Sequence, residues 1–483
     1  MNSNFIECLR KILSLDSILI SEEEKRPYET DGLTAYRQLP GVVVLPKNEP
    51  EVQQILKLCV DHGVPIVPRG HGTGLSGGAL PHAQGVLLSL NRLNRIVAIN
   101  PSERWVTVQP GVRNLAVSEA VAPFGLYYAP DPSSQIACSI GGNVAENSGG
   151  VHCLKYGLTL HNLIRVRGLT VSGEALELTN HGSAAGGYDL LALVTGSEGL
   201  LVVVTEVTLK LLPKPAMAQV IMATFSSVEQ AGDAVAKIIA SGFIPAGLEM
   251  MDGPTIRAAE AFVQAQYPVD AEALLLCEVD GWPVSVAEEI QQLSMILKEA
   301  GAIEQRVSQS EAERLKLWAG RKAAFPAVGR LAPDYYCIDG TIPRRFLGQV
   351  LRTIYQLSEK YQLGVCNVFH AGDGNLHPLI LFDGSVPGQL DKTERFAGEI
   401  LELCIKMGGT ITGEHGVGIE KLDQMCSQFN TVEQELFLGL KDVFDPQGLL
   451  NPGKAIPSLH RCAELGKMVV HHNLLPHPEL PRF

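Results

Sequence analysis

The chain has 483 residues, of which 46% are hydrophobic and 19% are charged, and its formal net charge is −13 at pH 7. Single hydrophobic cores stop growing near about 250–300 residues, so this length predicts two or three domains. The acidic balance argues against nucleic acid or an anionic membrane as the main partner. The ten cysteines form no C-x-x-C pair, which argues against an iron–sulfur cluster and predicts reduced thiols in a cytoplasmic protein. No run of 18 apolar residues is present to span a membrane.

The first part of the chain alternates between strand and helix patterns. After a short N-terminal helical segment, residues 41–46 predict a strand. A helix follows Asn48, which forms a cap-like pair with Glu51, and it ends at His62 and Gly63. This alternation predicts an α/β unit with a ligand loop at a strand end. The further strands that we predict are residues 64–69, 86–90, 96–100 and 105–109.

A glycine-rich loop follows the strand at residues 64–69, with glycine at positions 70, 72, 74, 77 and 78. Glycines at this density let backbone N–H groups converge on phosphate oxygens. The loop contains a G-x-G-x-x-G pattern, but a strand rather than a helix follows it, which argues against a Rossmann site. No Gly-Lys-Ser/Thr closes it as in Walker A. We interpret the loop as a diphosphate cradle, and a surface loop without a ligand is the alternative.

Two later segments share this glycine-rich character. Residues 130–150 contain Asp-Pro-Ser-Ser at 131–134, Ser-Ile-Gly-Gly-Asn at 139–143 and Asn-Ser-Gly-Gly at 147–150. Residues 195–205 join the turn Gly-Ser-Glu-Gly to a fully apolar strand. Each segment alone is more often structural, but three such loops beside strands favour one shared polar ligand.

These motifs resemble the FAD-binding domain of the vanillyl-alcohol oxidase type (PCMH) flavoprotein family. The resemblance implies that residues 68–78 hold the FAD diphosphate, and that the later segments line the isoalloxazine and adenine. Members with covalent flavin carry a histidine where this chain has Thr73, so non-covalent FAD is implied. The cofactor-binding residues implied are Pro68, Arg69, Gly70, Gly72, Thr73, Gly74, Ser76, Gly77, Pro132, Ser139, Ile140, Gly141, Gly142, Asn143, Asn147, Gly149, Gly150, Glu198, Gly199 and Val204.

Beyond the Pro-Lys-Pro sequence at 213–215 the chain shows two βαβ-like blocks. Strands at residues 219–225 and 247–251 flank a helix at 228–240, and strands at 273–279 and 302–307 flank a helix at 284–300. Two such blocks predict an antiparallel, ferredoxin-like sheet backed by helices. The predicted fold class is α+β. Its parts are an N-terminal helical segment (1–39), a two-part FAD-binding α/β domain (40–215), a substrate or cap domain with the metal site (216–425) and a helical C-terminal segment returning to the FAD domain (426–483).

Two histidines in the second half of the chain form a candidate metal site with a later glutamate. His370 and His377 are seven residues apart, which in one continuous strand would place them on opposite faces. The turn sequence Gly-Asp-Gly-Asn at 372–375 allows a reversal that brings both imidazoles together. Residues 411–418 are interpreted as leaving a strand with Glu414 and His415 adjacent. The set suits Zn²⁺, Mn²⁺ or Fe²⁺, and the alternative is core histidines with Glu414 in a cap or salt bridge.

These segments resemble the metal-dependent 2-hydroxy-acid dehydrogenase branch of the same family. The resemblance implies that His370, His377 and Glu414 bind a divalent metal and that His415 is the catalytic base. It also implies oxidation of a small 2-hydroxy acid by proton abstraction and hydride transfer to flavin, with glycolate favoured over D-lactate.

The substrate carboxylate needs a fixed cation, and the sequence at 318–322 resembles the family helix that carries a substrate arginine. The arginine here is Arg321, whose guanidinium offers a two-pronged match to a carboxylate. Composition alone predicts Arg321 as a solvated helix residue, and Lys421 is a second candidate. Leu379 stands where 2-hydroxyglutarate enzymes carry asparagine, which favours a small substrate.

The resemblance also implies partner subunits, one of them an iron–sulfur protein, and association with the inner face of the membrane only through such partners. Alternatives within the family are a D-lactate or a D-2-hydroxyglutarate dehydrogenase. Alternatives from other classes are a metal-dependent hydrolase without flavin and a catalytically silent flavin-binding subunit.

Overall fold

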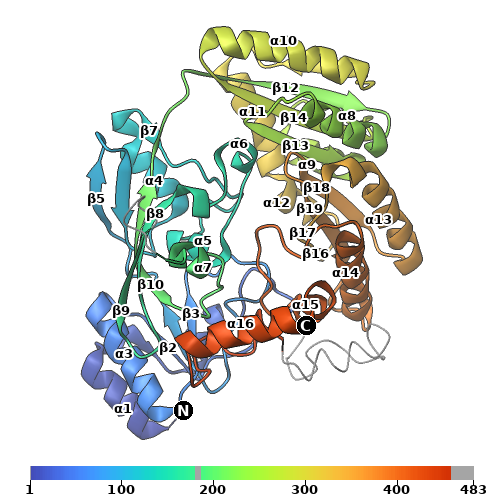
Figure 1. The fold of residues 1–483 in the computed structure, drawn as a ribbon. Coiled ribbons are helices and arrows are strands. Elements are labelled where there is room, and N and C mark those ends of the chain that lie inside the picture. The colour runs from blue at the N-terminus through green and yellow to red at the C-terminus, as the bar shows by residue number, and fades with distance from the viewer. Residues whose placement is uncertain (1, 180–186, 458–483) are drawn as a thin grey trace. The chain divides into compact units, whose positions relative to one another are not determined.

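The computed structural model describes residues 2–179 and 187–457, and the chain divides into two compact units (Figure 1). Unit 1 is drawn from Met1–Gly149, Leu158–Pro213 and Glu414–Phe483, and unit 2 from Gly150–Gly157 and Lys214–Gly413. Each unit therefore combines segments that are far apart in the sequence.

Unit 1 contains a four-stranded sheet of order β1-β2-β4-β3, formed by Ile18–Leu19, Val42–Val44, Val86–Ser89 and Ile66–Arg69. β2 and β3 both pair parallel with β4, and every residue of β2 and β4 is buried, as continuous apolar strands in parallel sheets require. Helices α1 (Ser3–Ile12) and α3 (Glu49–His62) share the core of this sheet. The predicted cap of α3 is confirmed, because the Asn48 side chain accepts a hydrogen bond from Glu51 N at 3.0 Å.

A second, antiparallel sheet of unit 1 has the order β5-β6-β10-β8-β9. Its strands are Ile96–Asn100, Trp105–Val108, Val203–Lys210, Leu163–Leu169 and Ala175–Thr179. The predicted C-terminal return to this unit is confirmed, because Ile66 N donates to Leu449 O and Asn451 N donates to Ile66 O. The other elements of unit 1 are α2 (Glu22–Lys25), α4 (Asn114–Val121), β7 (Leu126–Tyr127), α5 (Ile140–Glu146), α7 (Leu190–Val194), β11 (Leu212–Pro213), α15 (Leu422–Gln428) and α16 (Thr431–Phe444).

Unit 2 is built on an eight-stranded sheet of order β15-β12-β14-β13-β18-β19-β16, with β17 paired to β19. The predicted ferredoxin-like part is confirmed: β12 (Met217–Phe225), β13 (Gly247–Asp252), β14 (Ala273–Gly281) and β15 (Glu304–Val307) pair antiparallel, with helices α8 (Val228–Ala240) and α10 (Pro283–Glu299). The sheet continues into β18 (Val365–His370), β19 (Asn375–Phe382), β16 (Asp334–Cys337) and β17 (Gly340–Thr341). The remaining helices are α6 (Cys153–Tyr156), α9 (Gly253–Val263), α11 (Glu311–Lys322), α12 (Ala324–Val328), α13 (Leu347–Tyr361) and α14 (Gln389–Lys406).

Three predictions about local structure are corrected. The segment 139–150 is not loop throughout, because α5 forms over Ile140–Glu146 with Ser139 accepting a hydrogen bond from Gly142 N at 3.3 Å. The strand that residues 411–418 are predicted to leave is only a single bridge at Thr410, and the chain bends after it, with Gly416 at φ +81°. Cys426 is disulfide-bonded, so the predicted reduced state is wrong there, because the spacing of cysteines along the chain does not show which thiols lie close together in the fold.

Within the described ranges 2–179 and 187–457, we find no helix with both the length and the apolarity needed to cross a bilayer.

Candidate active site

The glycine loop of unit 1 joins the parallel strands β3 and β4 without a helix between them, as predicted. Gly72 (φ +69°) and Gly77 (φ +74°) occupy the left-handed region that favours glycine. The space beside Gly74 is open, because no described atom outside its immediate neighbours lies within 4 Å of the point where a Cβ would stand. The Ser76 hydroxyl is buried and has no hydrogen-bond partner among the described residues. Open space at Gly74 and an unpartnered hydroxyl in the same loop fit a group rich in acceptor oxygens, such as the FAD diphosphate.

Charged side chains hold the loop through its backbone. Arg69 Nη1 donates to Ala79 O at 3.4 Å, and a Cβ on Gly72 would overlap the Arg69 guanidinium. Asp31 Oδ2 accepts from Ala79 N at 3.3 Å, and burial raises the pKa of Asp31 to about 6. Lys454 Nζ donates to Gly78 O at 3.0 Å, and burial lowers the pKa of Lys454 to about 7. These charges are used to fix the loop.

The other two glycine-rich segments lie against this loop within unit 1. A Cβ on Gly70 would overlap Ser139 Oγ, and a Cβ on Gly199 would lie 3.0 Å from Pro68 Cγ. The second and third segments also meet, because Glu198 N donates to Ala145 O at 2.8 Å. The structure therefore brings the predicted cofactor-binding segments together, except that Gly150 belongs to unit 2.

Several of the predicted cofactor residues have polar side chains that are occupied by protein contacts. Asn143 Oδ1 accepts from Asn114 Nδ2 at 3.0 Å, and Asn147 Oδ1 accepts from Leu160 N at 2.9 Å. The Glu198 carboxylate accepts from Val417 N and Gly418 N, each at 2.7 Å, and burial raises the pKa of Glu198. Glu198 thus fixes the returning C-terminal segment to unit 1.

In unit 2, β18 and β19 form a hairpin that carries the two predicted histidines. His370 stands opposite Asn375, and Val368 stands opposite His377. Directly opposed residues of antiparallel strands share a face, so His370, Val368 and His377 lie on the same face. The imidazole centroids are 5.1 Å apart and both side chains are buried. The predicted chain reversal is confirmed.

Met250 of β13 is opposite Phe369 of the antiparallel strand β18, so the preceding residue, Glu249, is level with His370. Glu249 and His370 therefore lie on the same face of the sheet. Glu249 Oε1 lies 2.8 Å from His370 Nδ1, and its Oε2 accepts from Arg321 Nε at 2.8 Å and lies 2.6 Å from Arg321 Nη2. Arg321, on α11, is 1% exposed, so the prediction of a solvated residue is wrong. The Glu249 carboxylate supplies the opposite charge that allows the guanidinium to be buried. Arg321 Nη1 has no hydrogen-bond partner in the part of the chain that the structure describes.

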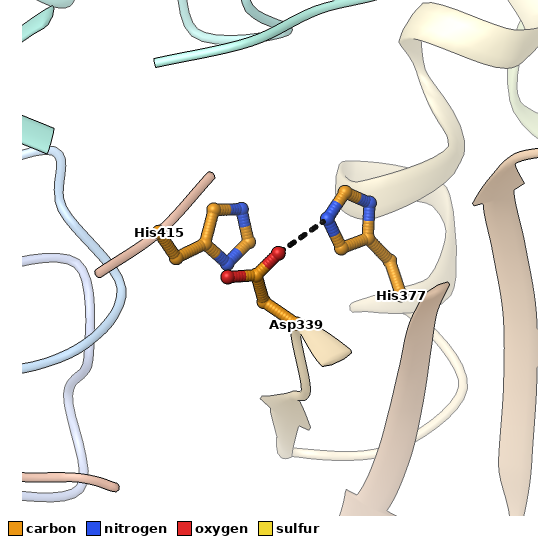
Figure 2. Close-up of side chains that lie close together, drawn as sticks. All are labelled: Asp339, His377 and His415. Atoms are coloured by element: carbon orange, nitrogen blue, oxygen red, sulfur yellow. Dashed lines mark ion pairs between the residues drawn. The ribbon is translucent and has the colours of Figure 1, made fainter. Parts of the chain in front are cut away.

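Asp339 links His377 to the segment that precedes Glu414. Figure 2 shows its carboxylate directed at the His377 ring, with Oδ1 3.6 Å from Nε2. Its Oδ2 accepts hydrogen bonds from Thr412 Oγ1 at 2.6 Å and from Gly413 N at 3.1 Å. Gly413 is packed so closely that a Cβ there would lie 2.5 Å from the Asn375 amide group. Asp339 is fully buried and therefore fixes the chain up to the residue before Glu414.

Glu414 and His415 begin the segment that returns to unit 1. Glu414 Oε2 accepts from Gly149 N at 3.1 Å, and His415 Nε2 lies 4.0 Å from Glu414 Oε1. Lys421, the second candidate for substrate binding, is buried and donates to Gly416 O at 2.8 Å, so its ammonium group stabilises this segment.

Sequence reasoning missed Glu249 and Asp339. Glu249 is a single charge within the otherwise apolar start of β13, Gly-Leu-Glu-Met-Met, and such a residue is buried only with a partner. That pattern was a usable signal. Asp339 lies shortly after β16 and immediately before Gly340, and an Asp-Gly pair in the sequence indicates only a turn.

A glycine loop between parallel strands, a second domain built on an antiparallel sheet and a returning C-terminal segment are the features of a two-domain flavoprotein fold. The fold is similar to that of p-cresol methylhydroxylase with substrate bound, with a TM-score of 0.80 and 15% identity over 95% of this chain and 97% of that one. It is also similar to 4-ethylphenol oxidase from Gulosibacter chungangensis, with a TM-score of 0.79 and 17% identity over 95% of this chain and 98% of that one. At these identities the likeness establishes the fold alone.

Two family models match the chain, an FAD binding domain over residues 40–179 and the C-terminal domain of FAD linked oxidases over residues 214–455. The chain belongs to the FAD-linked oxidase family. It is 62% identical over 466 residues to the glycolate oxidase subunit GlcD of Escherichia coli K12, covering 96% of this chain and 93% of that protein. It is 38% identical to the GlcD subunit of Bacillus subtilis (88% and 91% covered) and 32% identical to a D-lactate dehydrogenase of Anaerostipes hadrus (90% and 94% covered).

Proposed function

We propose that this chain is the FAD-carrying subunit of an enzyme that oxidises a small 2-hydroxy acid to the 2-oxo acid. The favoured substrate is glycolate, and D-lactate is the second choice. The relatives named as glycolate oxidase subunits and as a D-lactate dehydrogenase support this substrate class. The observation that carries the proposal lies in unit 2, where Glu249 joins the buried His370 to a buried arginine with an unpartnered Nη1. The ring centroid of the buried His377 lies 5.1 Å from that of His370.

Arg321 is the proposed binding residue for the substrate carboxylate. A buried guanidinium nitrogen without a partner is costly, and a carboxylate would satisfy it with a charge-assisted hydrogen bond. Leu379 is buried two residues beyond His377 on β19, hence on the same face of the sheet. An apolar residue there supports a substrate without a second carboxylate.

His370, His377 and Glu414 are the proposed ligands of a divalent metal, Zn²⁺ or alternatively Mn²⁺ or Fe²⁺. The donor set fits, because both imidazoles are buried on one face and Asp339 ties Gly413 to that face. Consecutive Cα atoms lie about 3.8 Å apart, so the Cα of Glu414 lies about that far from the Cα of Gly413, which Asp339 holds. Such a metal would supply Lewis acidity to the substrate hydroxyl and carboxylate oxygens.

His415 is the proposed base that removes the proton of the substrate hydroxyl. It stands two residues after Gly413, which Asp339 holds. The bound flavin supplies the two-electron acceptor that takes the hydride from the same carbon. Loss of one proton and one hydride converts the alcohol carbon to a carbonyl, so the reaction is balanced.

The FAD-binding residues proposed for unit 1 are those named above from the three glycine-rich segments, with the cofactor held non-covalently. The E. coli and B. subtilis relatives are named as subunits, which supports a proposal that electrons leave through partner subunits, one of them an iron–sulfur protein. A cytoplasmic location, at the inner face of the membrane through such partners, is part of this proposal.

An anaerobic screen tests the proposal most simply. FAD-loaded protein is mixed with glycolate, D-lactate, L-lactate and 2-hydroxyglutarate, and flavin absorbance is followed. Rapid bleaching by glycolate, slower bleaching by D-lactate and none by 2-hydroxyglutarate are expected. No bleaching by any acid would favour the silent flavin-binding subunit, and a purified protein that cannot bind flavin would favour the hydrolase.

A further inference from the structure

We propose that Glu249 is a positioning residue that couples the metal ligand His370 to the substrate-binding Arg321, so that one buried carboxylate orients both. The inference rests on the proposed function, because it concerns the same site. Glu249 itself is 1% exposed and lies on β13, outside every motif that suggested the site.

The contact with His370 engages one of its two ring nitrogens. Glu249 Oε1 lies 2.8 Å from Nδ1, so Nδ1 is engaged and Nε2 is the nitrogen that a metal can take. Metal-binding histidines are commonly oriented in this way by a carboxylate, and loss of that partner typically weakens metal binding about 10–100-fold. The His370 side chain is buried, so the carboxylate replaces the solvent that would otherwise contact Nδ1.

The contact with Arg321 uses one edge of the guanidinium. Glu249 Oε2 lies 2.8 Å from Nε and 2.6 Å from Nη2, which fixes the plane of the group. Nη1 is left without a hydrogen-bond partner among the described residues. The same carboxylate therefore contacts both the guanidinium group of Arg321 and Nδ1 of His370.

A purely structural role, anchoring α11 to the sheet, is the competing explanation. The chain offers a matched control for it in Glu278 of β14, which stands opposite Gly247 and so lies on the same face as Glu249. Glu278 is also buried, and it anchors α11 through Arg314 Nη1 at 2.7 Å and through Trp318 Nε1. Glu278 Oε1 also lies 3.1 Å from His152 Nε2, so the partners given for Glu278 differ from those of Glu249.

The test compares Glu249→Gln, Glu249→Asp and Glu278→Gln in the FAD-loaded protein. Affinity for Zn²⁺ and Mn²⁺ is measured by competition with a chromogenic chelator, and KM and kcat for glycolate are measured separately. Glu249→Gln is expected to weaken metal binding about 10–100-fold and to raise KM. Glu249→Asp keeps the charge but is one methylene shorter, so it should recover part of both losses. Glu278→Gln should leave metal affinity within about twofold, since it does not contact a ligand.

Unchanged metal affinity in Glu249→Gln would overturn the inference, as would an equal loss in Glu278→Gln, which would indicate a general effect of α11. If Glu249→Gln is not recovered as folded protein, Glu249→Asp decides, with about a tenfold loss supporting the inference and unchanged affinity overturning it. His370→Ala separates the two levels of the proposal. If His370→Ala binds metal as tightly as the wild type, the proposed metal site is wrong. If His370→Ala loses metal affinity but Glu249→Gln does not, the metal site stands and only the role of Glu249 is wrong.

Discussion

The glycine loop of unit 1 and the histidine face of unit 2 use charged residues in opposite ways. In unit 1, Asp31, Arg69 and Lys454 bind backbone amides and carbonyls of the loop, and the open space lies beside glycine. In unit 2, Glu249 and Arg321 bind each other and His370, and the free donor is a side-chain nitrogen. The first arrangement suits a large cofactor held by main chain, and the second suits a small charged substrate. Substitutions in the two regions should therefore fail in different ways.

The largest effect is expected where chemistry is lost and cofactor binding is kept. His415→Asn removes the proposed base, so flavin reduction by glycolate should slow by about 10²–10⁴-fold, the usual contribution of a general base. Stopped-flow absorbance under anaerobic conditions measures this rate, and the FAD content of the purified variant should equal that of the wild type. Unchanged reduction kinetics would refute the assignment of His415.

Loop support in unit 1 should appear as a pH dependence of stability. The pKa of Asp31 is raised to about 6 from 3.8, so the folded state binds the proton more tightly and the free energy of unfolding falls as pH rises from about 4 to 6. Two pKa units correspond to about 3 kcal/mol. In urea denaturation, the difference between wild type and Asp31→Asn should show this slope. Parallel curves for the two proteins would contradict it.

Arg321 gives the corresponding test in unit 2. Arg321→Ala removes a charge-assisted hydrogen bond worth about 1.5–3 kcal/mol, so KM for glycolate should rise about 10–150-fold while FAD stays bound. Lys322→Ala, at the exposed next position, is the control and should leave KM unchanged. An identical substrate dependence in Arg321→Ala and wild type would remove Arg321 from the site.

The smallest effect is expected at Gly74. An alanine there meets no described atom within 4 Å and has no positive φ to adopt, so the stability of the FAD-free protein should not fall. It would extend into the space proposed for FAD, and overpacking of about 1–3 kcal/mol predicts an FAD affinity lower by about 5–150-fold. Gly439→Ala on α16 is equally open and should not affect FAD. Fluorescence titration of both variants measures this, and equal FAD affinities would contradict the proposed cradle.

Local signals in the sequence predicted the elements that depend on local physics. Asn48 and Gly63 define the ends of α3, and the turn sequence at 372–375 reverses the chain between His370 and His377. Both are determined by caps and turns within a few residues. The helix α5 was missed because Gly141 and Gly142 have poor helix propensity, whereas its Ser139 cap and packing in unit 1 stabilise it.

Long-range partners could not be predicted in this way. Glu249 precedes His370 by 121 residues and Arg321 by 72 residues, so its role depends on the pairing of β13 with β18. The same partner explains why Arg321 is buried although composition predicts exposure. Asp339 likewise acts through segments that the sheet brings to it, Thr412 and Gly413.

The central proposal is that oxidation of the substrate needs both the flavin and a metal held by the histidines, and metal depletion tests it most directly. FAD-loaded protein stripped of divalent metal with a chelator should no longer be bleached by glycolate under anaerobic conditions, and Zn²⁺ or Mn²⁺ should restore bleaching in wild type but not in His370→Ala or His377→Ala. Bleaching at the full rate in metal-free protein, or in both histidine variants, would contradict the claim.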